Sequence, residues 1–430
     1  MRRAAKALAA GGVLAACLAV VGPASASPTT VCANGCLYSS IQDAINAATP
    51  SATITIGAGK YYENLVVDKS VTLQGSGNGT VIYPAVSQPL CPSDLTSSAS
   101  LCGASSIILV QANNVTITNL RLEGDNPHLT SGVIVGGADI DARNGIIEDY
   151  NAGVFSTTVS NVKVSDVYLR GIYASSGGTF NFRNDTVNNV QGSPSSIAMF
   201  NFGGSGVMAD NTVTNANDAI SANWSTGTQF LGNDISKSGS GVHTDNNGGS
   251  GGAADLIQGN TVHNCPTDGY GVFVFAPYVS ATVDSNTVTG CAVGLAAFGS
   301  GASGQGPTFS NNDVNGSGAK TTDPTGTYGA YLTTDQLGNG FADLTATLTG
   351  NSFKHFGTGM FVTQASGGQA TVTAHNNSFL NNGTGANGMP STVVNATNNW
   401  WGCKQGPNLG GGCDTAIGTV AFTPWLTQQP

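Results

Sequence analysis

His243 and Asp245 are the pair in this chain best suited to proton-transfer chemistry, because they stand two residues apart in a stretch that we expect to be a β-strand. Side chains two apart on a strand point to the same face, and an imidazole beside a carboxylate can act as a general base. Glycoside hydrolysis needs a second carboxylate roughly 5 to 9 Å away, and Asp218 and Asp268 are the acidic residues nearby. The alternative is that His243 is an ordinary surface histidine.

A second group of charges lies between residues 139 and 149, in a chain where charged residues make up only 9%. Its four carboxylates provide the hard oxygen ligands that Ca²⁺ takes in proteins. We therefore consider a calcium site, with a solvated turn and a local ion pair as the alternative. The candidate ligands are Asp139, Asp141, Glu148 and Asp149.

A repeated six-residue motif indicates how these side chains are positioned. The motif is an apolar residue, two small or polar residues, Asn, one further residue and a second apolar residue. Successive Asn residues are 22 to 39 positions apart, and a period in this range predicts a solenoid. Weaker copies lie upstream, with Asp185 in the Asn place of one of them. The strong copies carry Asn211, Asn233, Asn260, Asn286, Asn312, Asn351, Asn377 and Asn399.

Each repeat has room for three short strands and three turns, which is one turn of a parallel β-helix with rungs about 4.8 Å apart. The composition agrees, because 60 Gly and few charges favour short strands and tight turns over long exposed helices. The motif Asn then points inward, and identical Asn residues on stacked rungs can bond into a ladder. We therefore assign the repeated Asn a structural role.

The third strand of each repeat begins at a Gly or Ala, which sets the inward and outward positions along it. Outward aromatic rings on a flat sheet suit sugar rings, which have an apolar face and polar edges, and a large exposed apolar patch usually marks an interaction site. The alternative is that loops such as residues 316–340 cover the rings and extend the core. The aromatic residues at or beside these positions are Tyr173, Phe200, Trp224, Phe273, Phe275, Phe298, Tyr331 and Phe361.

The two ends of the chain differ from its repeats. Residues 1–26 have a basic start, an apolar run and a small-residue cleavage pattern, which predict a secretion signal. Lipoprotein anchoring at Cys17 is the alternative. We expect 27–430 to be one β-helix domain, because a repeat array of this length can form a single body. Residues 39–48 are predicted to form an amphipathic helix that caps the N-terminal end, and 398–430 to cap the C-terminal end.

The charge and the hydropathy narrow the choice of partners. Removing 1–26 changes the formal charge from −10 to −13, and a body this acidic is a poor nucleic-acid binder. After residue 26, no stretch reaches the roughly 20 apolar residues that a membrane span needs. We expect a secreted monomer whose partner is a polysaccharide or a surface glycan.

Eight cysteines follow Cys17, and they occur in close pairs. An even number in an oxidising compartment suggests disulfides. Cys265 and Cys291 are one repeat apart, so they would lie on adjacent rungs, where a bridge is geometrically reasonable. The four expected pairs are Cys32 with Cys36, Cys91 with Cys102, Cys265 with Cys291, and Cys403 with Cys413.

The repeated six-residue motif with its central Asn resembles the short repeats of secreted right-handed parallel β-helix proteins of the pectin-lyase-like superfamily. The closing segment Asn398-Asn-Trp-Trp-Gly402, with Gly406-Pro407 behind it, carries the same resemblance, and residues 52–83 are similar to the opening of pectin methylesterases. The resemblance implies an all-β, single-stranded β-helix with three strands per rung. The catalytic segments of pectin methylesterases, alginate epimerases and polygalacturonases are not found, so pectin methylesterase activity is disfavoured.

Two functions follow from these observations. The first is a carbohydrate-active or carbohydrate-binding protein that holds a glycan along its outward aromatic face, as a polysaccharide lyase or glycoside hydrolase if it is catalytic. In the lyases of this superfamily basic residues act on uronates, so the resemblance implies such a role for Arg143 or Arg170. The second is a non-catalytic structural or adhesive solenoid of the cell envelope or extracellular matrix.

Overall fold

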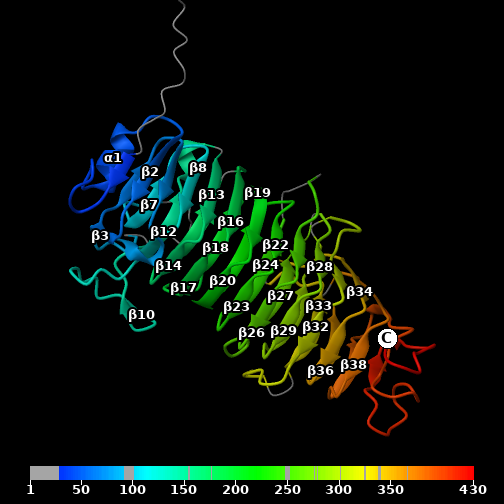
Figure 1. Cartoon of the computed structure of the whole chain (residues 1–430). Coiled ribbons are helices and arrows are strands. Elements are labelled where there is room, and N and C mark those ends of the chain that lie inside the picture. The colour runs from blue at the N-terminus through cyan, green and yellow to red at the C-terminus, as the bar shows by residue number, and fades with distance from the viewer. Residues whose placement is uncertain are drawn as a thin grey trace, which may run out of the picture.

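The computed structural model describes residues 29–91, 101–153, 155–175, 177–246, 252–275, 277, 279–300, 302–323, 326–337, 340–365 and 367–430. The proposed secretion signal and Cys17 lie outside these residues. The described chain winds into a long stack of parallel strands, which runs from the N-terminal to the C-terminal end of the molecule (Figure 1). A complete turn of the stack adds one strand to each of three parallel sheets, which we call sheets A, B and C, and the turns at the ends are incomplete.

Sheet A contains the strand that precedes the motif Asn of each repeat. Its 15 strands pair in parallel, as in Ile257 with Val283 of the next rung. They are β1 (Thr29–Val31), β2 (Ala52–Ile56), β5 (Val71–Gln74), β8 (Val115–Thr118), β13 (Ser156–Ser160), β16 (Thr179–Arg183), β19 (Ser205–Ala209), β22 (Gln229–Leu231), β25 (Leu256–Gln258), β28 (Thr282–Asp284), β31 (Thr308–Ser310), β34 (Leu344–Thr349), β37 (Ala370–His375), β40 (Val393–Asn395) and β42 (Val420–Ala421).

Sheet B contains the strand that follows the motif Asn. Its 12 strands are β3 (Gly59–Tyr62), β6 (Thr80–Tyr83), β9 (Arg121–Glu123), β14 (Lys163–Ser165), β17 (Thr186–Val190), β20 (Thr212–Ala216), β23 (Asp234–Ser236), β26 (Thr261–His263), β29 (Thr287–Thr289), β32 (Asp313–Asn315), β35 (Ser352–Lys354) and β38 (Ser378–Leu380). A small antiparallel hairpin, β10 (Ile134–Val135) and β11 (Ala138–Asp139), stands apart from the stack.

Sheet C contains the third strand of each repeat and carries the candidate site. Its 13 strands are β4 (Leu65–Val67), β7 (Ser106–Val110), β12 (Asn144–Glu148), β15 (Arg170–Ala174), β18 (Ile197–Phe202), β21 (Asp218–Asn223), β24 (Ser240–Asp245), β27 (Tyr270–Phe275), β30 (Val293–Ala297), β33 (Tyr328–Thr333), β36 (Thr358–Thr363), β39 (Thr384–Gly388) and β41 (Ala416–Gly418). The prediction of three strands per rung is thus confirmed.

The motif Asn residues form the predicted ladder in the turn between sheets A and B. Asn260 is typical, since its amide nitrogen donates to Asn286 Oδ1 at 2.9 Å and its backbone N–H donates to the same oxygen at 2.9 Å. The pattern continues along the column, with side-chain bonds of 2.8–3.0 Å from Asn211 to Asn399. These residues are buried, so each bond satisfies polar groups that burial would otherwise leave unpaired.

Glycines at the start of the sheet C strands lie where the backbone comes close to the next rung. A Cβ at Gly241 would lie 2.3 Å from Gly271 O and 2.7 Å from the Val262 side chain. Real Cβ atoms do not approach so closely, so the position requires Gly or a local shift. Val242, the residue after this Gly, points inward and is completely buried, which confirms the predicted alternation.

One short α-helix, α1 (Ile41–Ala47), lies at the N-terminal end of the stack (Figure 1), together with two 3-10 turns, η1 (Gly77–Gly79) and η2 (Tyr150–Ala152), elsewhere in the described chain. The helix buries Ile41, Ala44 and Ile45 in the main core. Its first turn is held by the Glu63 carboxylate, which accepts from the backbone N–H groups of Ile41 and Gln42 at 2.9 Å each. Carboxylates stabilise helix N-termini in this way.

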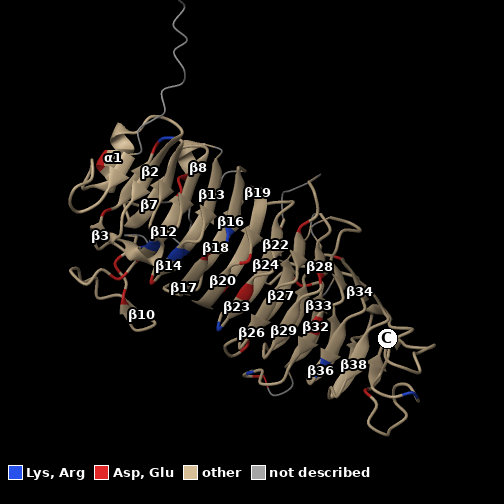
Figure 2. Cartoon of the chain, in the orientation of Figure 1, with Lys and Arg blue, Asp and Glu red and all other residues tan. Residues whose placement is uncertain are grey.

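A buried tryptophan lies in the C-terminal rung, and the disulfides form as the sequence predicts. Trp401 is buried and stacks on Phe379 with ring centroids 4.8 Å apart. All four predicted cysteine pairs are bonded. Charges are sparse, so most of the visible strand surface carries neither basic nor acidic residues (Figure 2). None of the helices in the described part of the chain is long and apolar enough to span a membrane.

Candidate functional site

The outward face of sheet C aligns His243 with five of the predicted aromatic residues in one register row. Strand pairing aligns His243 with Ser221 on one side and with Phe273 on the other. The row continues across the rungs in both directions through Tyr173, Phe200, Ser221, His243, Phe273, Ala296, Tyr331 and Phe361. The parallel register therefore confirms the outward alignment that the repeats predicted.

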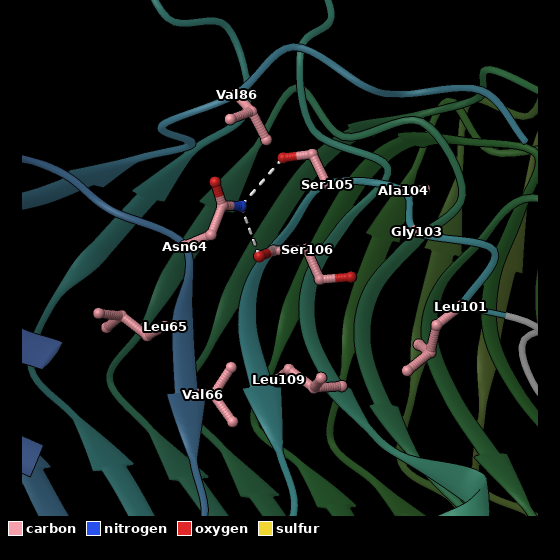
Figure 3. A pocket seen from close by; sticks show the side chains of 10 residues that line it. All are labelled: Asn64, Leu65, Val66, Val86, Leu101, Gly103, Ala104, Ser105, Ser106 and Leu109. Carbon is pink, nitrogen blue, oxygen red and sulfur yellow. Dashed lines mark hydrogen bonds between the residues drawn. The ribbon is translucent and has the colours of Figure 1, made fainter. Parts of the chain in front are cut away.

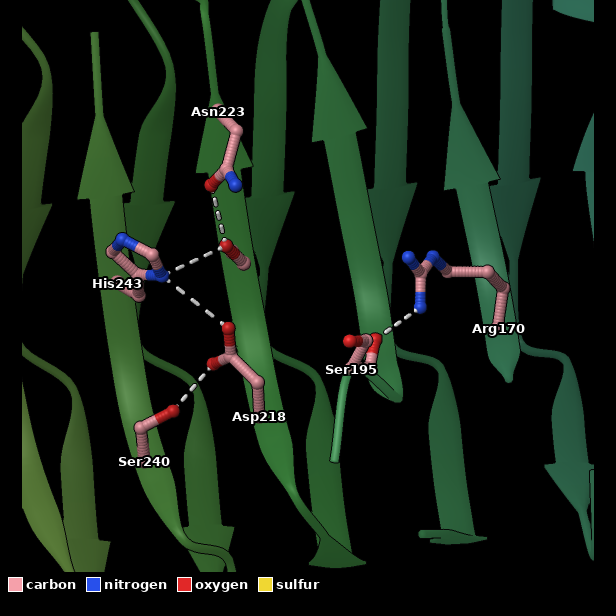
Figure 4. A network of polar contacts seen from close by, with 7 residues as sticks. Arg170, Ser195, Asp218, Asn223, Ser240 and His243 are labelled. Atoms are coloured by element: carbon pink, nitrogen blue, oxygen red, sulfur yellow. Dashed lines mark hydrogen bonds and ion pairs between the residues drawn. The ribbon is translucent and has the colours of Figure 1, made fainter. Parts of the chain in front are cut away.

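His243 has its carboxylate partner on the neighbouring strand (Figure 4). Its Nδ1 lies 3.3 Å from Asp218 Oδ2 and 3.2 Å from Ser221 Oγ. Asp218 begins β21, and its carboxylate faces outward toward His243 and Ser240. The partner that we expected, Asp245, is buried two residues further along β24. The His243–Asp245 pairing is thus replaced by a His243–Asp218 pairing, because in parallel strands the closest outward neighbour is often on the next rung.

The hydrogen bonds around His243 determine which ring nitrogen carries the proton. Ser221 Oγ donates to Asn223 Oδ1 at 2.9 Å, so it can accept a hydrogen from Nδ1. Asp218 Oδ2 also accepts, and Ser240 Oγ donates to Asp218 Oδ1 at 2.5 Å. Nδ1 therefore carries the hydrogen in the neutral ring, which leaves the lone pair on Nε2.

His243 Nε2 is buried and has no hydrogen-bond partner among the described residues. The ring stacks on Phe273 with centroids 4.0 Å apart and planes inclined by 21°, which fixes its orientation. Ser221 and Asp218 both contact Nδ1, whereas in a serine nucleophile triad the serine and the acid flank opposite ring nitrogens. The arrangement therefore leaves the lone pair of Nε2 unused and does not activate Ser221.

Asp268 is not brought to this site. It is exposed in the turn before β27, where it accepts from the backbone N–H and the hydroxyl of Thr322 at 2.8 and 2.7 Å. These hydrogen bonds hold the pKa of Asp268 below its usual value. These bonds hold the loop that includes Thr322, so the contacts of Asp268 are structural.

The aromatic residues form two separate groups on either side of His243. On the N-terminal side, Tyr173 and Phe200 are only 2% and 4% exposed and pack with Ile147 and Ile197. On the C-terminal side, Phe273, Phe275 and Tyr331 are half-buried around the buried ring of Phe298, and Phe361 stacks at the far end. The rings of the first group are therefore covered and extend the core. The rings of the second group are partly exposed and form an aromatic platform.

Two tyrosines of the platform were missed by the sequence analysis. Tyr270 and Tyr328 open their strands and pack against Phe273 and Tyr331, with centroid distances of 5.7 and 5.4 Å. Each stands immediately before a leading Gly, at a position that also faces outward. Alternation counted back from the inward Val272 would place Tyr270 inward as well, so period two does not identify such a residue. Only the structure shows that the alternation breaks at the leading Gly. Tyr270, Phe273, Phe298 and the exposed Leu337 enclose a small apolar cavity of about 70 Å³.

Trp224 follows the end of β21 and is exposed in the turn from sheet C to sheet A. Its ring centroid lies 6.4 Å from that of Phe202, the last residue of β18. It therefore extends the outward face around the ends of the strands.

The two predicted arginines are buried and engaged with the protein. Arg170 donates to the backbone oxygens of Leu169 and Ser195 at 3.0 and 2.6 Å, and Figure 4 shows its contact with Ser195. Its guanidinium lies over the Phe200 ring. Burial lowers the pKa of Arg170 to about 10, which leaves it charged at neutral pH. Arg143 donates to Pro89 O and is 3% exposed. Because their guanidinium groups brace loops against sheet C, the two residues are not placed to receive a uronate.

The four candidate calcium ligands do not converge. Glu148 accepts from Thr157 Oγ1 at 2.5 Å and from the backbone N–H of Ser175 at 2.6 Å, and burial raises its pKa to about 7. The other three bond to separate partners: Asp139 to Ser131, Asp141 to Asn126 N–H, and Asp149 to Asn151 N–H and Gln111. Within the described ranges, no three His, Cys, Asp or Glu side chains form a group that could hold a metal. The calcium prediction is wrong here because the local chain separates the carboxylates.

A further cavity of about 300 Å³ opens on the N-terminal end of sheet C (Figure 3). Asn64 lies at its edge and donates to Ser105 Oγ and Ser106 O at 3.0 and 2.7 Å. Its walls are otherwise mostly aliphatic, from Val66 and Leu109. With no titratable residue among the described residues of its lining, this cavity offers binding surface and no proton-transfer chemistry.

The comparisons with known proteins agree on the fold. Residues 144–314 match a family model described as a right handed beta helix region. The A-module of the mannuronan C-5 epimerase AlgE6 from Azotobacter vinelandii is similar at 15% identity and a TM-score of 0.50, over 89% of this chain and 94% of that one. The catalytic domain of a GH87 alpha-1,3-glucanase in complex with tetrasaccharides is similar at 15% identity and a TM-score of 0.52, over 92% and 70%.

No curated protein matches the chain by sequence. The family model and the solved structures together with the three parallel sheets show that the chain has a right-handed parallel β-helix fold of the pectin-lyase-like type.

Proposed function

We propose that this chain is a secreted carbohydrate-active or carbohydrate-binding β-helix that holds a glycan along the outward face of sheet C. The observation that carries the proposal is the His243–Asp218 pair, with Nε2 unbonded among the described residues, beside the half-buried aromatic platform. The two solved structures named above carry the names of carbohydrate-active proteins, which agrees with the proposal. Their low identity shows the fold alone.

In the catalytic form of this proposal, His243 Nε2 takes or returns the proton of the glycan. Asp218 accepts from Nδ1–H and stabilises the imidazolium that forms, and Ser240 holds the Asp218 carboxylate in place. A base of this kind serves proton abstraction in a lyase. Hydrolysis needs a second carboxylate, and Asp245, two residues along the same strand, is the one that β24 supplies.

The His243→Gln variant is expected to lose at least about a hundredfold in kcat/KM on any polysaccharide that the parent cleaves, because general base catalysis contributes about 10² to 10⁴. A panel of neutral and acidic polysaccharides would be assayed for unsaturated products by ultraviolet absorbance and for new reducing ends. The matched control is His263→Gln, since His263 forms an exposed pair with Asp234 on sheet B at 3.1 Å. Full activity in His243→Gln would exclude this site.

A non-catalytic structural or adhesive solenoid is the second candidate. Two observations favour it: His243 Nε2 is buried, and the N-terminal aromatic pair is covered. Binding to members of the polysaccharide panel without turnover of any of them would decide for this function.

The same proposal includes export of the chain. We propose that residues 1–26 are removed as a secretion signal and that residues 27–430 act as one monomeric domain, with 398–430 closing its C-terminal end. The four disulfides agree with an oxidising compartment. Mass spectrometry of the exported protein would give the cleavage position and would detect a lipid on Cys17.

We also propose that α1 caps the N-terminal end of the stack. The Ile45→Ala variant is then expected to lose about 2–4 kcal/mol of unfolding free energy, because a fully buried side chain is truncated. The control Asn46→Ala changes an exposed position on the same helix and should have little effect. Urea unfolding followed by circular dichroism measures both, and equal small effects would argue against the cap.

A further inference from the structure

Trp224 occupies a backbone position that favours glycine, and its ring is turned to solvent. It has a φ of 55° and is 54% exposed. On the preceding rung the equivalent residue is Gly203, with a φ of 77°, as the pairing of Phe202 with Asn223 shows. Left-handed backbone is disfavoured for a bulky residue, and an exposed ring gains little from packing. The fold alone therefore does not account for a tryptophan here.

The ring stands beside a groove formed by successive turns between sheets C and A. The groove has a volume of about 520 Å³, within the range of small-molecule sites. Its floor is largely backbone, because glycines fill the stacked turns, and none of the described side chains that line it is charged. The lining residues are Gly177, Gly203, Gly204, Ser205, Trp224, Ser225, Thr226, Gly227 and Ala253.

Ser225 gives an independent indication of a ligand. The residue is only 2% exposed, and its Oγ has no hydrogen-bond partner in the described part of the chain. A buried hydroxyl without a partner is unfavourable, and this one belongs to the wall of the groove. A ligand hydroxyl in the groove would satisfy it.

We propose that this groove, which we call the Trp224 groove, binds one pyranose unit of a neutral glycan at a subsite separate from His243. The apolar face of the sugar stacks on the indole, and its hydroxyls bond to the Ser225 and Thr226 hydroxyls and to the backbone of the turns. The uncharged lining selects a neutral sugar over a uronate. The proposal rests on the proposed glycan function. It adds a second sugar-binding position, at the turns where the sheet C strands end.

The test uses the full chain labelled with 5-fluorotryptophan, whose four Trp residues give four fluorine resonances. The Trp224→Gly variant identifies the Trp224 signal by its loss. Cellohexaose, laminarihexaose and nigerohexaose are the neutral probes, and hexagalacturonate is the acidic probe. We expect at least one neutral probe to shift the Trp224 resonance, and hexagalacturonate to leave it in place.

The same variant separates binding from folding. Trp224→Gly is expected to unfold at the same or a higher temperature than the parent, because Gly adopts the left-handed backbone without strain, and to bind the neutral probe about tenfold more weakly. Trp224→Tyr, which keeps a ring, should bind more tightly than the Gly variant.

Three results would overturn the proposal: no shift with any neutral probe, an equal shift with hexagalacturonate, or an affinity that Trp224→Gly does not change. The fluorine signal reports binding without turnover. Inactivity of the His243 site would therefore leave this result unaffected.

Discussion

The Asp185→Asn variant is expected to unfold at a higher temperature than the parent, by a margin that increases from pH 5 to pH 8. Asp185 stands in the Asn column and is 1% exposed. Its Oδ1 accepts from Val162 N–H at 2.9 Å, and its own N–H donates to Asn211 Oδ1 at 2.9 Å. Its Oδ2 has no partner in the residues described, at the place where Asn donates to the next rung.

Burial raises the pKa of Asp185 to about 8. The native chain therefore keeps a proton on Asp185 that the unfolded chain releases above about pH 4, so stability falls as the pH rises from about 4 to about 8 and is level beyond. The slope is about 1.4 kcal/mol per pH unit, which gives a cost of roughly 4 kcal/mol at pH 7. The amide of the Asp185→Asn variant carries no such cost, and its nitrogen donates at every pH, as the other Asn residues of the column do.

Scanning calorimetry of the parent and the variant at each pH unit from 5 to 9 measures this difference. The control is Asp68→Asn, which makes the same change at an exposed position and should alter the unfolding temperature little at any pH. A difference between Asp185→Asn and the parent that does not depend on pH would contradict a protonated Asp185.

The second large effect is expected from Asn286→Ala, in the middle of the ladder. The Asn286 amide nitrogen donates to Ile257 O, Asp284 O and Asn312 Oδ1. Its Oδ1 accepts from the backbone and the side-chain nitrogen of Asn260 at 2.9 Å each. Truncation leaves several of these groups buried without a partner, at about 1–3 kcal/mol each, so we expect a loss of roughly 3–6 kcal/mol.

Urea unfolding measures the loss, and the control is Asn395→Ala. Asn395 is exposed on β40, where its side chain accepts from the neighbouring Thr397. The expected order is a large loss for Asn286→Ala and a small one for the control. Similar small losses would mean that the ladder contributes little beyond shape, and the structural role of the column would have to be abandoned.

The disulfide pairings were predictable because the paired cysteines are close together in the sequence or are separated by one repeat. Cys265 and Cys291 are one rung apart, so the repeat length alone brings them together. The buried Arg170 shows the opposite case. Its partners, Leu169 O and Ser195 O, belong to turns whose course no repeat pattern specifies. The sequence pattern therefore cannot distinguish an arginine that faces solvent from one that is buried and bonds to a neighbouring turn.

The sequence by itself determined the parallel β-helix and the register of its rungs. Burial of every second residue and the bonding of Asn to Asn repeat identically along the chain, so local periodicity is sufficient to specify them. Only the tertiary structure decided which outward residues meet. His243 pairs with Asp218 and not with Asp245, and Tyr173 is covered while Trp224 is exposed. These outcomes depend on contacts between rungs and on the loops that cover them, which vary from turn to turn and leave no period in the sequence.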